Sequence, residues 1–253
     1  VGRQKERKAE VIDAKTKLIP EIGSQDNVTV LRAWREIKDR QLPLTGDDGI
    51  LVGADLRRAN LMGVDLMGAN LTGALLESAN LSGVNLHKAD LRNGDLEKVI
   101  LREANISDAI LNKAKLANAS LEEADLEQAT LQFANLSFAK LEGATLVRAD
   151  LSNADLSHAD LNGANLKGAN LNRANLSQVN LLEANLMGAN INDAIFNEQT
   201  VLPNSVRTVR EEKDYERVRQ LDIVKVIYWT PGTDMTRYTD PNHPDFWQPE
   251  WAK

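Results

Sequence analysis

The chain has 253 residues, a formal net charge of −7 and 42% hydrophobic residues, which is enough apolar content for a large core. It contains no Cys, so disulfides, thiolate nucleophiles and thiolate metal sites are excluded. No run of about eighteen apolar residues occurs, so no segment of the sequence is predicted to span a membrane.

Residues 1–48 are expected to form a helical N-terminal cap. Asp26 and Asn27 are both favourable helix N-cap residues, so a helix is predicted from there to about Arg40. An earlier helix is expected within residues 4–18, and it should stop near Pro20 because proline disrupts a helix interior.

The second of these helices carries an apolar stripe that includes Leu31, Trp34 and Ile37. We expect these side chains, Trp34 above all, to cover the end of the repetitive core that follows, since open solenoid ends invite stacking into fibres. A ligand-binding role for Trp34 is the alternative interpretation.

Residues 49–200 repeat one five-residue unit, Ala-(Asp/Asn)-Leu-x-x, without insertion or deletion from Leu51 to Phe196. A period of five fits neither an α-helix nor a plain strand. Within a unit, Ala and Leu lie two positions apart, so a short extended piece points both inward. The last two positions are rich in Gly, Ser and Asn, which is typical of a turn. If each turn is roughly a right angle, four units close a square coil of about twenty residues.

This pattern resembles the pentapeptide-repeat family over about three-fifths of the chain, and its Leu-centred units are most similar to those of cyanobacterial members. The resemblance implies an all-β solenoid, a right-handed quadrilateral β-helix of about seven to eight coils. With a helical N-terminal cap and an α/β C-terminal cap, the expected domains are 1–48, 49–200 and 201–253.

Residues 201–253 are expected to form the C-terminal cap. Residues 204–220 are predicted to be a charged helix, and residues 221–229 a strand because they are rich in β-branched and aromatic side chains. The tail from Tyr238 to Trp251 is rich in Pro and aromatic residues. Packing of this tail against the core is the favoured interpretation, and a docking segment for a partner is the alternative.

No arrangement of residues predicts catalysis, a cofactor or a bound metal. The three His residues, His87, His158 and His243, do not have a metal-binding spacing. Neighbouring carboxylates of the repeat, such as Asp150 and Asp155, fall on successive sides of the square and cannot act as a pair. We therefore expect a protein that is not an enzyme, with no catalytic residue, no cofactor and no metal.

Departures from the unit mark the expected contact surface. Two Phe residues occupy outward turn positions that are otherwise polar, and four Glu residues gather on one face in successive coils. An aromatic edge beside an acidic face suits a basic protein partner. The predicted partner surface consists of Phe133, Phe138, Glu103, Glu122, Glu123 and Glu142. A solvated charged face with two stray Phe residues is the alternative.

These observations favour a scaffold that binds an unidentified protein partner through the outer faces of a rigid β-helix. Residues 50–200 carry about twelve basic and nineteen acidic residues, so direct nucleic-acid binding is not expected. Family members that confer quinolone resistance resemble B-form DNA and occupy the DNA site of gyrase, which is the alternative function. The long aromatic tail favours a monomer over an end-to-end dimer. A cytoplasmic location is expected, although the chain starts at Val1 and an upstream signal or anchor stays open.

Overall fold

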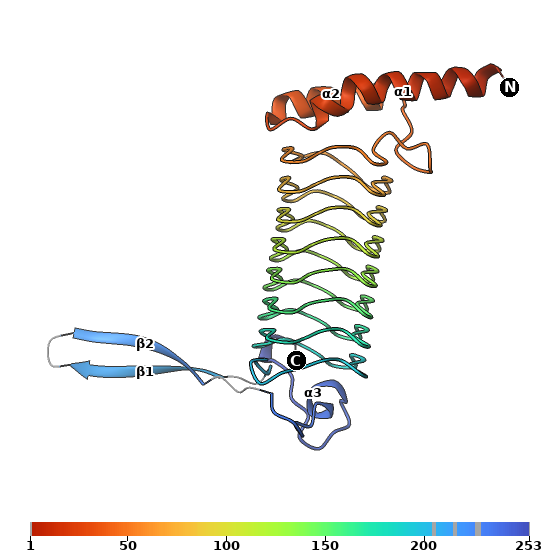
Figure 1. The fold of residues 1–253 in the computed structure, drawn as a ribbon. Helices are drawn as coiled ribbons and strands as arrows, with labels where there is room; N and C mark the ends of the chain where they lie inside the picture. Colours follow the sequence, from red (N-terminus) through yellow and green to blue (C-terminus); the bar gives the residue numbers. More distant parts are fainter. Residues whose placement is uncertain (1, 204–205, 215–216, 226–228, 253) are drawn as a thin grey trace.

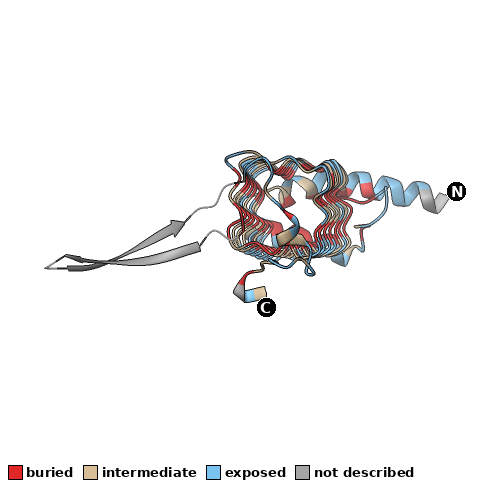
Figure 2. Cartoon of the chain, turned by 90° about the horizontal axis from the view of Figure 1, so that it is seen from below, coloured by how far each residue is buried: buried red, intermediate tan, exposed pale blue. Residues whose placement is uncertain are grey.

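The computed structural model describes residues 2–203, 206–214, 217–225 and 229–252. The regular elements are α1 (Gly2–Ile22), α2 (Asn27–Asp39), β1 (Val206–Asp214), β2 (Arg217–Lys225), α3 (Thr236–Thr239) and a short 3-10 helix, Glu250–Ala252. Between α2 and β1 the chain winds into a stack of coils (Figure 1). Viewed along its axis, this stack is a four-sided column (Figure 2).

Parallel bridges between residues twenty positions apart join each coil of the column to the next. The bridges begin at Asp55 and continue to Val201. Each involves the outward residue in the middle of a side, and flanking hydrogen bonds such as that from Leu116 N to Asn135 O, at 2.6 Å, complete the ladder. The sides are single-residue bridges rather than long strands, because each side holds only one outward residue between two inward ones.

The inward positions form one continuous hydrophobic core (Figure 2). Unit after unit, the central Leu and the small residue two positions before it are almost completely buried. In the middle of the column, for example, Ala114 is 1% and Leu116 0% exposed. This confirms the prediction that large and small side chains alternate inside, an arrangement that fills a narrow interior at close-packed density.

The repeat changes register at its C-terminal end. The last bridge joins Asn180 to Val201, one position more than the spacing of the other bridges. Thr200 is buried beside this bridge, and its hydroxyl donates to Leu176 O at 2.9 Å. A single extra residue is thus accommodated without breaking the ladder, because the Thr200 hydroxyl satisfies a carbonyl of the coil before it.

Helix α2 lies across the first coils (Figure 1). Its N-cap is Asp26, whose carboxylate accepts from Val28 N at 3.2 Å and from Thr29 N at 3.1 Å. The helix ends at Asp39. The start and the end therefore agree with the prediction, because the capping carboxylate satisfies N–H groups that have no partner within the helix.

The three residues predicted to cover the column differ in burial. Trp34 is 5% and Ile37 0% exposed, and both belong to the hydrophobic cluster that contains the first coil leucines. Leu31 is 37% exposed and lies at the rim, beside Gly63 of a corner. Leu31 is therefore on the border of the apolar stripe, where α2 reaches the edge of the column.

Helix α1 is longer than the sequence predicts. It continues to Ile22 and contains Pro20, whereas the expected end lies near that proline. Leu18 and Ile22 are 3% and 1% exposed within the hydrophobic cluster. Burial of these two side chains holds the last turn and offsets the single hydrogen bond that Pro20 cannot donate.

The predicted helix over residues 204–220 is wrong. In its place β1 and β2 form an antiparallel hairpin that projects from the column (Figure 1). In the register of the hairpin, Glu212 is opposite Arg219 and Asp214 is opposite Arg217. The charged sequence suggests a helix surface, but the backbone of this segment pairs with the strand that follows it.

The predicted strand over residues 221–229 is confirmed as far as Lys225, where β2 ends. Residues 226–228 lie outside the part of the chain that the structure describes. The β-branched run therefore forms a strand, as expected, but it pairs with the segment that was assigned to a helix.

The aromatic tail packs on the last coils of the column. Tyr238 is 2% exposed, and the Trp229 ring stacks on Phe196 with 6.1 Å between ring centroids. The Trp251 indole donates to Glu183 O at 3.2 Å. The chain's own residues thus lie over both ends of the column (Figure 1).

Candidate protein-interaction surface

Every corner of the column carries one residue with a left-handed backbone. From Gly53 to Asp193, the second of the two turn residues has a positive φ in each unit. The next N–H then donates back across the turn, as Ala134 N does to Leu131 O at 3.0 Å. A positive φ at only the second turn residue is the pattern of a type II turn, which favours Gly or Asn at that position.

Two of these left-handed positions hold phenylalanine. Phe133 and Phe138 have φ values of 58° and 60°, and they are 58% and 53% exposed. A bulky side chain is strained in this backbone region, and an exposed ring contributes nothing to the core. The same positive φ occurs with other large residues, such as Arg148 and Gln178, so the exposed aromatic rings and not the backbone set these two corners apart.

Phe138 is supported by a ring from the next coil. The His158 ring stacks on it with 4.3 Å between centroids and 8° between planes. His158 occupies the equivalent corner one coil further on, also with a positive φ. Stacking restricts the rotation of Phe138, which reduces the entropy that a partner would have to remove on binding.

The two phenylalanines lie on different corners. Residues 134–136 form the side of the column between them, and residues 139–141 form the next side, after Phe138. The two rings therefore leave the column from neighbouring edges, although they are only one unit apart in the sequence.

The four predicted glutamates share one corner, at the far edge of side 139–141 and its equivalents. Glu103 N donates to Glu122 O at 3.0 Å, and Glu123 N donates to Glu142 O at 2.9 Å. Successive coils thus hold these four residues next to one another. We call this column of four glutamates the acidic edge.

Negative charge on the acidic edge is only partly neutralised. Arg102 pairs with Glu122 at 3.1 Å, but the second Glu122 oxygen is buried without a hydrogen-bond partner among the described residues. Burial raises the pKa of Glu142, and the carboxylates of Asp160 and Glu122 add to this effect, while Lys140 opposes it. The contributions of Asp160 and Glu122 to this pKa shift show that carboxylates lie close together here, although burial is the larger cause.

The predicted residues do not form one flat patch. Phe138 and the acidic edge lie at the two edges of side 139–141, whereas Phe133 is one corner further round the column. The predicted surface therefore wraps around three corners. A flat partner can rest on Phe138 and the acidic edge together, or on both phenylalanines, but not on all of them.

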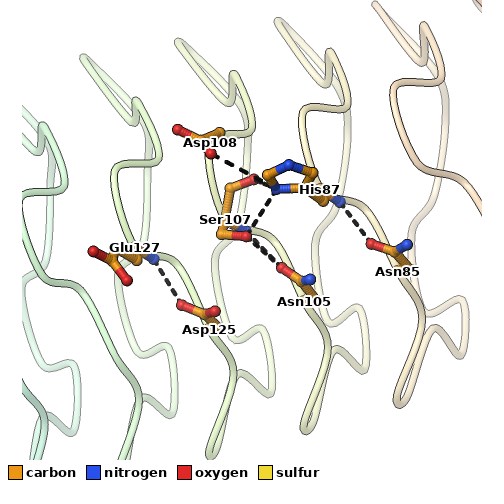
Figure 3. Close-up of polar contacts among 7 residues, drawn as sticks. All are labelled: Asn85, His87, Asn105, Ser107, Asp108, Asp125 and Glu127. Atoms are coloured by element: carbon orange, nitrogen blue, oxygen red, sulfur yellow. Dashed lines mark hydrogen bonds and ion pairs between the residues drawn. The ribbon is translucent and has the colours of Figure 1, made fainter.

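The sequence prediction missed the role of the outward Asp and Asn side chains. In many units their oxygen accepts from the N–H two residues ahead, which makes an Asx turn at the corner. Figure 3 shows three successive examples, in which Asn85, Asn105 and Asp125 accept from the backbone N–H groups of His87, Ser107 and Glu127. The signal in the sequence is the Asp/Asn preference at a fixed distance before each turn.

A histidine, a serine and an aspartate come together on this part of the column (Figure 3). His87 Nδ1 lies 3.0 Å from Ser107 Oγ and 3.7 Å from Asp108 Oδ2. A catalytic histidine uses one ring nitrogen for the serine and the other for the carboxylate. Here both contacts use the same nitrogen, and Ser107 Oγ also donates to Asn105 Oδ1 at 2.6 Å. This arrangement is not that of a serine nucleophile.

Over the described ranges, no three His, Cys, Asp or Glu side chains are grouped so that they could hold a metal ion. No helix within these same ranges has the length and the apolar content needed to cross a membrane. Phe133 and Phe138 are exposed on this column to about the same degree as Met67 and Ile195, and they differ from these in being aromatic. On the acidic edge, Glu103 and Glu123 are exposed, whereas Glu122 and Glu142 are half-buried.

Comparisons with known proteins identify the repeat. The family model for pentapeptide repeats matches in eight copies, over residues 48–77, 79–116, 109–146, 134–173 and 164–198. No curated protein sequence matches the chain.

Several solved structures are similar to the chain. One is QnrB1, a plasmid-mediated fluoroquinolone resistance protein, with 18% identity, a TM-score of 0.36, and coverage of 62% of this chain and 90% of that chain. Another is HetL, a protein involved in heterocyst differentiation regulation from the cyanobacterium Nostoc sp. strain PCC 7120, with 29% identity, a TM-score of 0.18 and coverage of 59% and 90%. A third comes from the Arabidopsis thaliana thylakoid lumen, with 26% identity, a TM-score of 0.28 and coverage of 50% and 76%.

The family model spans more than half of the chain and coincides with the four-sided column. Members of this family fold as right-handed quadrilateral β-helices, and the bridges between residues twenty positions apart have the spacing that four five-residue units require. The chain belongs to the pentapeptide-repeat family.

Proposed function

We propose that this protein is a non-enzymatic scaffold that binds a protein partner through the outer surface of its column. The observation that carries the proposal is the pair of exposed phenylalanines at strained corners, Phe133 and Phe138. Their rings do not fill the core, so we assign their role to contacts outside the chain's own fold.

The rest of the column supports a binding role over catalysis. Outward Asp and Asn side chains accept hydrogen bonds in Asx turns, and Ser107 is turned toward Asn105 rather than presented to a substrate. The regular ladder holds each corner in a fixed position relative to its neighbours, which suits a rigid binding surface.

The partner in this proposal is a protein with basic groups. The chain has a formal net charge of −7, which disfavours contact with nucleic-acid phosphates. We also propose that the scaffold is a monomer, because the residues over both ends of the column leave no open end for a second copy (Figure 1).

The test is affinity capture from an extract of the source organism. The intact chain is compared with the double variant Phe133→Ser/Phe138→Ser, and captured proteins are identified by mass spectrometry. A variant at an equivalent left-handed corner, Gln128→Ser, is the matched control. We expect at least one protein that the intact chain and the control capture and the double variant loses. Identical captured proteins for all three chains would refute the proposed surface.

The acidic repeat also supports the second candidate, a DNA mimic that occupies the DNA site of gyrase. This function predicts inhibition of gyrase supercoiling by micromolar or lower concentrations of the chain, weakened at high salt because the attraction is electrostatic. Supercoiling that proceeds unchanged would remove this candidate and leave the scaffold unaffected.

A further inference from the structure

The geometry of the corners limits what a single partner can touch. Side 139–141 has Phe138 at one edge and the acidic edge at the other, and Phe133 occupies the corner that precedes the Phe138 corner. We call this side, together with its equivalents 99–101 and 119–121 in two neighbouring coils, the docking side. The inference below rests on the proposed scaffold function and names the chemistry of the partner.

We propose that the docking side binds a basic amphipathic helix of the partner protein, with an apolar residue of that helix against Phe138 and its cations along the acidic edge. Phe133 lies outside this contact. Such a helix carries an apolar stripe next to a cationic stripe, and the docking side presents Phe138 at one edge and the acidic edge at the other. The positions equivalent to Phe138 in the two preceding coils are Lys98 and Asn118, so the apolar contacts of this side are Phe138 and Ile100.

The apolar part of the docking side is exposed and fixed in place. Phe138 is 53% exposed and is held by the His158 ring. Ile100, which is 36% exposed, lies on the same side in an earlier coil. Bridges join Ile100 to Ser120 and Ser120 to Lys140. The short Ser120 side chain leaves the surface low between the two apolar groups, so a helix can lie across it.

The charged part of the docking side favours a basic partner. Four carboxylates lie along the acidic edge. The cations of the docking side are Arg102, which pairs with Glu122, Lys140 in the middle of the side, and Lys98 at the opposite edge. Burial is the largest cause of the raised pKa of Glu142, and the contribution of Asp160 and Glu122 agrees with a local surplus of negative charge. Lysine and arginine side chains of a partner would neutralise the surplus, which steers binding and sets the orientation of the helix.

The experiment uses the full chain and a defined probe. The probe is a fluorescein-labelled synthetic helix of about eighteen residues built from Leu and Lys in amphipathic order, and its counterpart has Glu in place of Lys. Fluorescence anisotropy measures binding at low and at high NaCl concentration. Phe138→Ser and Phe133→Ser form a matched pair, since both remove an exposed ring from a left-handed corner. Far-UV circular dichroism checks that each variant is folded.

We expect the Lys probe to bind and the Glu probe not to bind. Phe138→Ser should weaken binding by about tenfold or more, while Phe133→Ser changes it by less than about twofold. The double variant Glu123→Gln/Glu142→Gln should also weaken binding and reduce its dependence on salt.

Three results would overturn the inference. If Phe138→Ser leaves binding unchanged, the probe is held by non-specific charge attraction. If Phe133→Ser costs as much as Phe138→Ser or more, the contact is not confined to the docking side. If the Lys probe fails to bind, the partner class is wrong. If the chain still captures a cellular protein through its phenylalanines, the scaffold function stands and only the basic helix is excluded as the partner.

Discussion

At the scale of single residues, each corner has one position that the fold requires and one whose side chain can vary. A corner needs a left-handed residue and an acceptor for the N–H that follows the side, and the repeat supplies the acceptor as Asp or Asn. Side chains at the left-handed position are free to vary, because they point out of the column. Phe133 and Phe138 are two such variable side chains, and each has a left-handed backbone that is unfavourable for a bulky residue.

Glu142 provides a pH-dependent prediction. Its pKa is raised above 4.5 by burial and by the carboxylates of Asp160 and Glu122. Because the folded pKa exceeds the unfolded value, this group stabilises the fold most when it is protonated, and stability falls as the pH rises from 4.5 through the folded pKa. Glu142→Gln should therefore be more stable than the unmodified chain at neutral pH, and the difference should shrink at acidic pH.

Urea denaturation at several pH values between about 4 and 7 measures this effect. The control is Glu6→Gln, which removes the same charge from an exposed position on α1. A Glu142→Gln variant that loses stability at neutral pH would show that the carboxylate is needed by the fold.

Phe133 provides a prediction about strain. Asn tolerates the left-handed backbone better than Phe, so Phe133→Asn should raise the free energy of unfolding by about 0.5–1 kcal/mol. Urea denaturation measures the change. The control is Gln128→Asn at an equivalent corner, which should give a gain no larger. Lower stability in Phe133→Asn would mean that the exposed ring has a structural role.

At the scale of elements, the bounds of α1 and α2 have different causes, local capping in one case and tertiary contacts in the other. Asp26 fixes the start of α2 through bonds to Val28 N and Thr29 N, a local effect. The end of α1 is decided by burial of Leu18 and Ile22, a tertiary effect that overrides Pro20. Cross-strand pairing similarly decides the structure of the hairpin.

Trp34 and Leu31 provide a prediction for α2. We propose that buried Trp34 closes the first coil, so Trp34→Ala should cost about 3–5 kcal/mol and expose residues 51–76 to faster amide exchange. Leu31→Ala, at a site that is 37% exposed, should cost less than about 1 kcal/mol. Hydrogen exchange detected by mass spectrometry measures both. Equal protection of the first coils in the two variants would contradict the capping role.

At the scale of the whole molecule, the column is a linear assembly. Each coil contacts only the coils before and after it, so stability is a sum of coil terms and interface terms. The two ends are the exceptions, because only there does a coil face something other than another coil. The tail covers one end through Tyr238, Trp229 and Trp251.

Tyr238 provides a prediction about association. The 253-residue chain should sediment as a monomer of 27.9 kDa. Tyr238→Ala removes a side chain that is 2% exposed, loosens the tail and should promote association through the last coil. Analytical ultracentrifugation at several concentrations distinguishes the two states. Trp251→Ala, at a site that is 48% exposed, is the milder control. A Tyr238→Ala variant that stays monomeric would show that the tail is not what keeps copies apart.

Sequence alone determined the column. The period of five, the small and large inward residues and the turn residues are local properties, and one unit implies the next because every coil repeats the same contacts. For the same reason, the family resemblance and the buried positions from Leu51 onward agree with the structure. The candidate residues were also visible, since each departs from the unit.

Only the tertiary structure decided the segments outside the repeat. These are the hairpin of β1 and β2, found where a helix was predicted, and the continuation of α1 past Pro20. Each depends on contacts outside the repeat register, and a local pattern holds no information about which distant partner will supply them.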